Sequence, residues 1–168
     1  MKLKITVKGI DSLFSFFDES EQMPYSSPHN LIGQINDDAC VAACARMILA
    51  DFGINAPESY LASALETERG AYLSKLPQVF REFGVKGNYE WRKILTIGDL
   101  SKAVESKRSI VSVQRKNAKF GHSVIVDDII NEKVRLCDPL PTGQGKSYAV
   151  SLETFTEVWL KSGVIYVK

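Results

Sequence analysis

Cys40 is the residue of this chain whose type and setting best suit covalent chemistry. It stands near the start of the segment 38–52, where apolar residues recur with the spacing of an α-helix. Unpaired N–H groups and the helix dipole at a helix N-terminus stabilise negative charge, and this favours the nucleophilic thiolate. The same N–H groups suit a developing oxyanion. The alternative is that Cys40 is a small buried residue, as free cysteines often are.

The residues on either side of Cys40 support a helix that begins there. Asp37 or Asp38 is expected to cap its start, and Gly53 to end it as a residue of left-handed conformation. Gln34 lies six residues before Cys40, in the loop that leads into the helix. Its side-chain amide is a candidate second donor to an oxyanion beside the thiol.

His122 is the candidate general base. It follows Gly121 and opens an apolar, β-branched run, 122–126, that predicts a strand. A glycine before it permits the close approach of another chain or of a substrate. A single histidine at the start of a strand is usually structural, but a remote cysteine at a helix tip and a carboxylate on the next strand favour a catalytic role.

That carboxylate is Asp138. It ends the predicted strand 133–137 and precedes Pro139, which cannot continue the hydrogen-bond ladder. If this strand pairs with the His122 strand through a turn at 130–132, Asp138 and His122 meet at one end of the sheet. The carboxylate would then accept the imidazole N–H, fix its tautomer and favour the imidazolium. The alternative is an Asp that serves only the Asp-Pro turn.

The other residues of suitable type fit chemistry less well. Cys44 falls on the apolar face of the helix and Cys137 lies inside a strand, so both are expected to pack in the core. His29 stands in a Pro- and Ser-rich loop, where a solvated or locally bonded histidine is the ordinary outcome. Asp127 and Asp128 follow the His122 strand at its far end, too distant from the imidazole.

The arrangement of elements indicates an α+β fold of one domain, 1–168. Helical patterns come first and β-branched runs later, which is typical of helices packed on an antiparallel sheet. The first eight residues alternate in an edge-strand pattern, 10–17 reads as a short helix, and 17–33 as a long loop. Further helices are expected over 38–52, 57–67, 75–83, 97–106 and 151–159, and strands over 109–113, 122–126, 133–137 and 163–167.

Composition excludes several classes of function. The 168 residues carry a formal net charge of +1, and basic residues are scattered, so nucleic acid is not expected as a partner. No apolar run reaches the roughly 20 residues that cross a bilayer, and no signal peptide is recognisable, so we expect a cytoplasmic protein without membrane contact. The three cysteines match no zinc spacing; free thiols, no metal and no cofactor are expected.

Three short motifs together resemble a known family. They are Gln34–Cys40 (QINDDAC), Gly121–Val126 (GHSVIV) and Cys137–Pro139 (CDP). Their order resembles the papain-like peptidases that process bacteriocin leaders, including the peptidase domains of peptide-exporting ABC transporters and their free-standing relatives. The likeness covers 31–168 and leaves 1–30 as an N-terminal extension.

The resemblance implies a papain-like cysteine peptidase fold and a role for each motif residue. Cys40 would attack the substrate, His122 would transfer protons, Asp138 would orient His122 and Gln34 would complete the oxyanion hole. The family usually has glycine directly after the nucleophile, where this chain has Val41. Substrate approach at that position is therefore expected to differ.

The leading hypothesis is a thiol protease that hydrolyses a peptide or protein through a thioester. Glutamine deamidation or transglutamination by the same triad is a second hypothesis, because the acyl-enzyme is shared. An inactive peptide-binding module is a third. A stand-alone enzyme of this kind also suits a bacterial toxin or effector that a secretion system delivers into a target cell, and an immunity or inhibitor protein would then be its partner.

Overall fold

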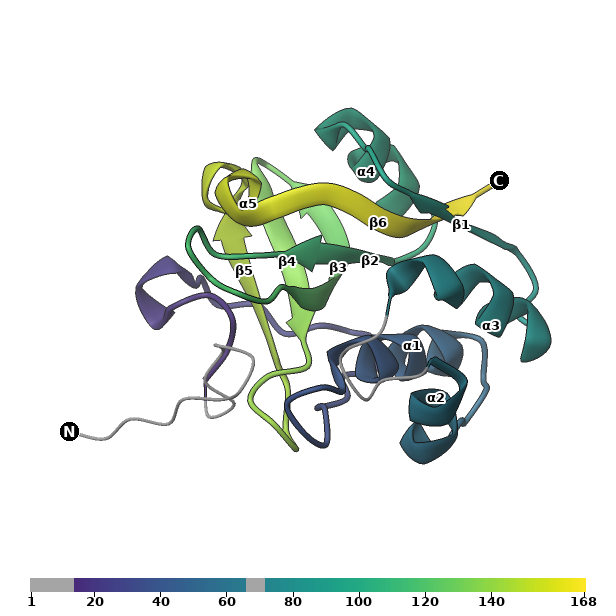
Figure 1. Ribbon diagram of the computed structural model, residues 1–168. Helices are drawn as coiled ribbons and strands as arrows, with labels where there is room; N and C mark the ends of the chain where they lie inside the picture. The colour runs from purple at the N-terminus through teal and green to yellow at the C-terminus, as the bar shows by residue number, and fades with distance from the viewer. Residues whose placement is uncertain (1–13, 66–71) are drawn as a thin grey trace.

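The computed structural model describes residues 14–65 and 72–168, in which one antiparallel sheet lies between two groups of helices (Figure 1). The order of strands across the sheet is β1-β6-β2-β3-β4-β5, and every neighbouring pair is antiparallel. The strands are β1 (Asn88–Arg92), β2 (Ser109–Val113), β3 (His122–Ile130), β4 (Lys133–Asp138), β5 (Lys146–Ser151) and β6 (Trp159–Val167).

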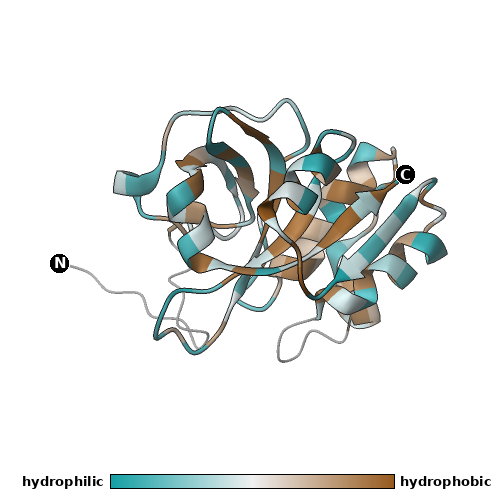
Figure 2. Cartoon of the chain, turned by 90° about the horizontal axis from the view of Figure 1, so that it is seen from above, coloured by the Kyte–Doolittle hydropathy of each residue, from teal (hydrophilic) through white to brown (hydrophobic). Residues whose placement is uncertain are grey.

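Alternation along the strands supplies a separate core to each face of the sheet. Ile110 of β2 and Ile125 of β3 belong to one buried cluster, whereas their neighbours Val111 and Val124 belong to the other. Both faces are therefore covered, and the middle strands carry apolar stretches, which are brown in Figure 2. Burial on two sides fixes the register that places the ends of β3 and β4.

Three helices cover one face and two cover the other (Figure 1). The first group is α1 (Cys40–Asp51), α2 (Glu58–Leu65) and α3 (Leu76–Glu82), and the second is α4 (Ile97–Val104) and α5 (Leu152–Val158). Two 3-10 turns, η1 (Glu19–Glu21) and η2 (Leu73–Lys75), complete the regular structure of the described residues. The α+β class expected from the sequence, with helices packed on an antiparallel sheet, is confirmed.

The helices predicted from residue 38 onward all occur, with shorter ends. The helix expected over 57–67 is described from Glu58 to Leu65, and residues 66–71 lie outside the described part. Gly53 ends α1 with a φ of +74°, as predicted, and Ser151 caps α5 by accepting a hydrogen bond from Thr154 N. The cap predicted for α1 is wrong: Ala39 is its N-cap, and neither Asp37 nor Asp38 caps it through a side chain.

Two strands were not predicted, and the start of the chain differs from expectation. β1 and β5 are both edge strands, and polar residues interrupt their pattern. The edge strand expected over 1–8 lies outside the described residues. The helix expected over 10–17 is wrong for its described part, 14–17, which is not helical. The predicted loop 17–33 contains η1, and its Met23 pairs with Ala149 of β5.

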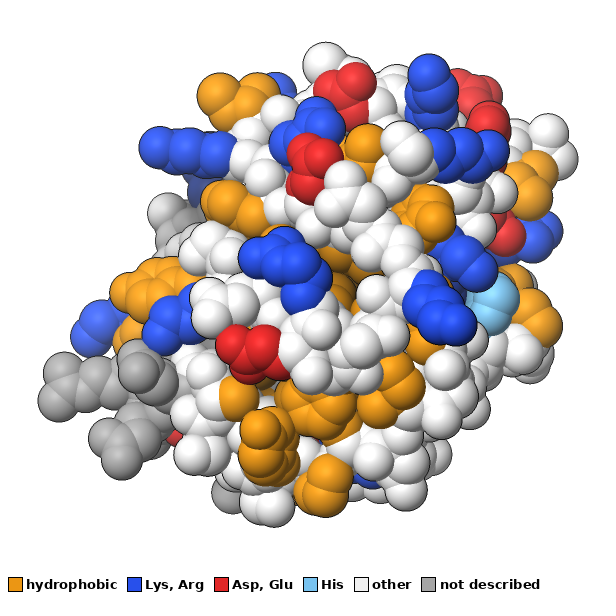
Figure 3. Space-filling model, turned by 90° about the vertical axis from the view of Figure 1, so that its right-hand side faces the viewer, with side chains coloured by type: hydrophobic (Ala, Val, Ile, Leu, Met, Phe, Trp, Pro, Cys, Tyr) orange, Lys and Arg blue, Asp and Glu red, His pale blue; other side chains and the backbone are white. Residues whose placement is uncertain are grey.

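Charged residues are mixed over the surface. On the face shown in Figure 3, basic and acidic side chains are interspersed in the upper half, and hydrophobic side chains gather in the lower half. Across residues 14–65 and 72–168, none of the helices combines the length and the apolar character required to cross a membrane.

Candidate active site

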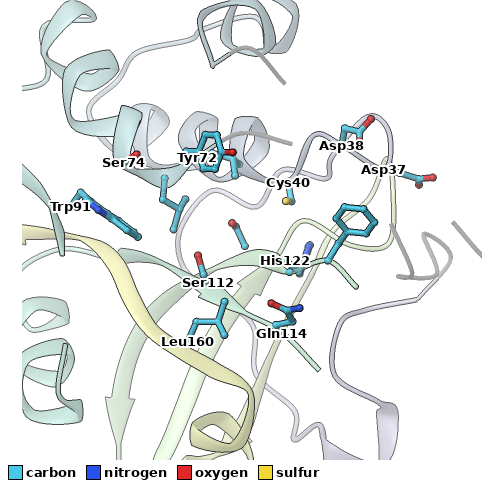
Figure 4. A pocket seen from close by; sticks show the side chains of 15 residues that line it. Asp37, Asp38, Cys40, Tyr72, Ser74, Trp91, Ser112, Gln114, His122 and Leu160 are labelled. Carbon is cyan, nitrogen blue, oxygen red and sulfur yellow. The ribbon is translucent and has the colours of Figure 1, made fainter. Parts of the chain in front are cut away.

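The Cys40 thiol lies at the first turn of α1 and lines a cavity of about 390 Å³ (Figure 4). The residue is partly exposed and carries a free thiol. Its backbone N–H is among the first N–H groups of the helix, which have no partner within the helix. The structure therefore places the Cys40 sulfur at the start of a helix and beside an open cavity, as expected.

A hairpin brings His122 and Asp138 together. β3 and β4 pair from Ile125 with Cys137 to Ile130 with Lys133, so that a two-residue turn joins them and the predicted pairing is confirmed. His122 begins β3 and Asp138 ends β4. The two side chains meet at the open end of this hairpin, where His122 Nε2 lies 2.8 Å from Asp138 Oδ1.

The Asp138 carboxylate is fully buried and its hydrogen-bonding capacity is filled. Oδ1 accepts from His122 Nε2 and from Leu140 N, the latter at 2.9 Å. Oδ2 accepts from Phe16 N at 2.8 Å and from the Tyr148 hydroxyl at 2.6 Å. All four contacts use the carboxylate as an acceptor, and hydrogen bonds to a charged acceptor are the stronger kind.

Cys40 and His122 form a coupled pair. The thiol is hydrogen-bonded to the His122 ring, and Nδ1 is the nitrogen left for it because Nε2 faces Asp138. Burial acts to lower the pKa of His122, but the charge and hydrogen bond of Asp138, followed by those of Cys40, raise it to about 10.

The same contact acts on the thiol. Burial acts to raise the pKa of Cys40, but the hydrogen bond and charge of His122, with smaller help from Ser123, bring it below that of an ordinary thiol. A thiolate beside an imidazolium is therefore the favoured state of the pair, and this is the nucleophilic form of cysteine.

Gln34 is buried in the loop before α1. Its backbone N donates to Pro139 O at 3.0 Å, which ties the loop to the segment after β4. Its side-chain Nε2 donates to Asn36 O at 2.7 Å, and its Oε1 has no partner. One Nε2 proton stays free of that bond, but Gln34 is not among the residues that line the cavity.

The cavity beside Cys40 is mostly apolar, with polar and acidic side chains at its edge (Figure 4). Three aromatic residues, Tyr72, Trp91 and Phe120, line it beside the Cys40–His122 pair. The other lining residues come from α1, η2, β2, β3, β6 and the loops before α1 and between β2 and β3, so no single sequence pattern gathers them. These additional lining residues are Asp37, Asp38, Val41, Leu73, Ser74, Ser112, Gln114, Gly121, Ser123 and Leu160.

The residues set aside from sequence do not line the cavity at the Cys40 thiol. Cys44 and Cys137 are fully buried in the core cluster of α1–α3, as predicted. Asp127 accepts hydrogen bonds from Tyr25 and Ser27 and pairs with Arg108, while Asp128 pairs with Arg135.

His29 lies in a loop and lines a second cavity, not the one at Cys40. Among residues 14–65 and 72–168 no cluster of three or more His, Cys, Asp or Glu side chains has the arrangement of a metal site.

The sequence profile of the Peptidase C39 family matches residues 29–168. The chain belongs to the peptidase C39 family. The resemblance inferred from the three motifs is thereby confirmed, and a cysteine peptidase is the class of enzyme that this membership indicates. A comparison with curated protein sequences finds no match.

Solved structures of C39 domains share the fold, which confirms the papain-like peptidase fold expected from the sequence. The peptidase domain of Streptococcus ComA, a bifunctional ABC transporter of a quorum-sensing pathway, superposes with a TM-score of 0.68 at 19% identity, over 83% of this chain and 98% of that one. A putative C39-like peptidase from Bacillus anthracis gives 0.65 at 18% identity, over 84% and 95%. A double-glycine-motif protease of an AMS/PCAT transporter, in complex with its leader peptide, gives 0.60 at 16% identity, over 82% and 90%.

Proposed function

We propose that this C39 protein hydrolyses peptide bonds with Cys40 as nucleophile, His122 as general base and acid, and Asp138 as the group that orients His122. One observation carries the proposal: a single imidazole is hydrogen-bonded to a buried carboxylate through one nitrogen and to a helix-tip thiol through the other. Nucleophile, base and orienting group then stand in the order that covalent acyl transfer requires.

The reaction follows from this geometry. The Cys40 thiolate attacks the peptide carbonyl, and the tetrahedral oxyanion accepts a hydrogen bond from the Cys40 backbone N–H. Gln34 supplies a second bond if its amide turns from Asn36 O toward the thiol. The His122 imidazolium protonates the leaving amine, a thioester forms, and His122 then activates the water that hydrolyses it. General acid–base catalysis of this kind contributes about 10²–10⁴-fold in rate.

The substrate is proposed to be a peptide or an exposed protein segment. An apolar cavity of about 390 Å³ with polar groups beside the thiol suits side chains of an extended chain. Leader-peptide binding in the transporter-associated relative supports a peptide substrate for the shared fold. Nothing in these comparisons supports the toxin, effector or immunity-partner hypotheses, which stay predictions from the sequence.

A peptide-library digestion tests the function. The wild-type protein and Cys40→Ala are incubated with a diverse peptide mixture, and the products are read by mass spectrometry. Cys44→Ala is the matched control, because it makes the same chemical change one helical turn away at a fully buried site. Cleavage by wild type and Cys44→Ala, with none by Cys40→Ala, supports the proposal.

Two other results would overturn it. Cleavage that persists in Cys40→Ala would remove Cys40 from the reaction. Intact peptides that change in mass at glutamine, without fragments, would replace hydrolysis with deamidation or transglutamination on the same residues.

A further inference from the structure

The segment before the C39 match reaches into the active site. The family profile begins at residue 29, yet Phe16 donates its backbone N–H to Asp138 Oδ2 at 2.8 Å. Its ring also stacks on the His122 imidazole, with ring centroids 5.6 Å apart and an interplanar angle of 11°. Phe16 thus contacts both members of the His122–Asp138 pair, once through its backbone and once through its side chain.

A second aromatic residue of the segment supports the same pair. Phe17 is buried, packs edge-on against Phe16 with centroids 5.1 Å apart and meets Tyr148 at 6.1 Å. Tyr148 donates its hydroxyl to Asp138. The carboxylate is therefore enclosed by the ends of two strands and by this segment, and attraction between Asp138 and an imidazolium is stronger where water is excluded.

Arg115, in the loop between β2 and β3, holds the segment against the site. Its guanidinium carbon lies 5.0 Å from the Phe16 ring centroid and 5.4 Å from that of Phe17. Its Nη2 donates to Phe16 O at 3.3 Å and to Glu21 Oε1 at 2.6 Å. Arginine can make these planar contacts and fork-shaped hydrogen bonds together, which a lysine cannot.

We propose that Phe16 is a positioning residue of the active site, and that Arg115 fastens Phe16 over the His122–Asp138 pair. The inference rests on the proposed role of Cys40 and His122. The imidazole must face Asp138 with one nitrogen and Cys40 with the other, and an aromatic ring parallel to it restricts rotation out of that plane. Without the ring, fewer molecules hold the thiol and imidazole in contact, and Cys40 loses part of what stabilises its thiolate.

The pH dependence of Cys40 alkylation measures this effect without a substrate. Iodoacetamide is applied across a pH series, and the modified Cys40 peptide is quantified by mass spectrometry. Besides His122, the acidic side chains of Asp37 and Asp38 line the same cavity, and they are present in every variant. The wild-type and His122→Ala proteins give the two reference profiles of alkylation rate against pH. His122→Ala is expected to react slowly until the pH approaches the pKa of an ordinary thiol.

Phe16→Leu removes the ring but keeps an apolar side chain. Its profile is expected to shift toward that of His122→Ala, with a loss of roughly 2- to 10-fold in the rate at acidic pH, as the strength of a stacked aromatic pair indicates. Phe16→Tyr keeps the ring and is expected to retain the wild-type profile. Arg115→Met leaves Phe16 in place but unfastened, and a smaller shift in the same direction is expected.

Phe155→Leu is the matched control. Phe155 is fully buried in the same core cluster but stacks on Trp159 instead of His122, so its loss lowers stability without the proposed effect. A Phe16→Leu profile that coincides with wild type, or a Phe155→Leu profile that shifts equally, would overturn the positioning role. If Phe16→Leu does not fold, an unshifted Arg115→Met profile would overturn it. Coincident wild-type and His122→Ala profiles would instead overturn the proposed function.

Discussion

The positions of two residues of ordinary chemistry support their proposed reactivity. Cys40 gains from the start of α1 and from an imidazole, and His122 gains from a carboxylate that no water reaches. The chain contains three cysteines and two histidines, yet the structure pairs only one of each. For Cys44, the other cysteine of α1, burial raises the pKa well above that of an ordinary thiol, and Cys40 and Asp138 add to this. Reactivity thus follows from surroundings and not from residue type.

The charge state of His122 gives the first prediction at this scale. NMR titration of the imidazole signals, assigned with His29→Gln, is expected to show His122 protonated through neutral pH and to lose its proton near pH 10. In Asp138→Asn the main attraction is gone, so burial should bring the pKa of His122 below its ordinary value of 6.5.

The same shift has a defined effect on stability. Because folding raises the pKa of His122, the pairing stabilises the fold fully below pH 6.5, and this contribution is lost as the pH rises toward about 10. Asp138→Asn should abolish that dependence. A wild-type His122 that titrates like an unpaired imidazole would contradict the pairing.

At the scale of elements, the loop that carries Gln34, the proposed oxyanion donor, lies very close to the loop between β4 and β5. A Cβ on Gly33 would lie 2.8 Å from the backbone carbon of Gln144, which is closer than real side chains come. The adjacent Gln34 is hydrogen-bonded on both sides, to Pro139 O and from Gly143 N at 2.7 Å. A glycine is needed here because the two backbones touch.

Gly33→Ala is therefore expected to displace the loop that carries Gln34. Loss of one oxyanion donor costs about 10²–10³-fold in kcat, so kcat should fall by up to that amount while KM changes less. Gly98→Ala is the control: the nearest neighbour of its Cβ is the Thr96 hydroxyl oxygen at 3.6 Å, and alanine is the better helix residue. Steady-state kinetics on a library-selected peptide makes the comparison, and equal kcat values for the two variants would refute the role of the loop.

The sequence predicted the central strands better than the edge strands and the contacts of the N-terminal segment. The hairpin of β3 and β4 could be foreseen because both strands are apolar and a short polar turn joins them. β1 could not, because only Tyr89 in Asn88–Arg92 is buried and the strand lacks a clear alternation. The contact of Phe16 with Asp138 spans 122 positions and involves a backbone N–H, for which no side-chain pattern exists.

At the scale of the molecule, a buried ion network joins the helices to the sheet away from the thiol. Arg108, only 2% exposed, donates to Asp51 of α1 at 2.8 Å and to Asp127 of β3 at 3.3 Å. It also donates to Asn30 O and Met47 O. One side chain thus connects α1, β3 and the long N-terminal loop. We expect the packing of these three elements to depend on it.

Arg108→Met should lower the free energy of unfolding by about 3–5 kcal/mol, because two carboxylates lose their buried cation. Urea denaturation measures the change. Arg135→Met is the matched control, since Arg135 pairs with Asp128 at 3.4 Å near the surface, where such pairs contribute about 0–1 kcal/mol. Equal losses of unfolding free energy in the two variants would show that the Arg108 network does not stabilise the packing of α1, β3 and the N-terminal loop.

The central claim is that His122 activates Cys40 for attack. Its most direct test is site-resolved alkylation by iodoacetamide at neutral pH, with all three cysteines quantified by mass spectrometry in wild type and His122→Ala. Modification of Cys40 well before the buried Cys44 and Cys137, with a loss of at least about tenfold in His122→Ala, is the expected result. A Cys40 that reacts no faster than an unpaired thiol, or at the same rate without His122, would contradict it.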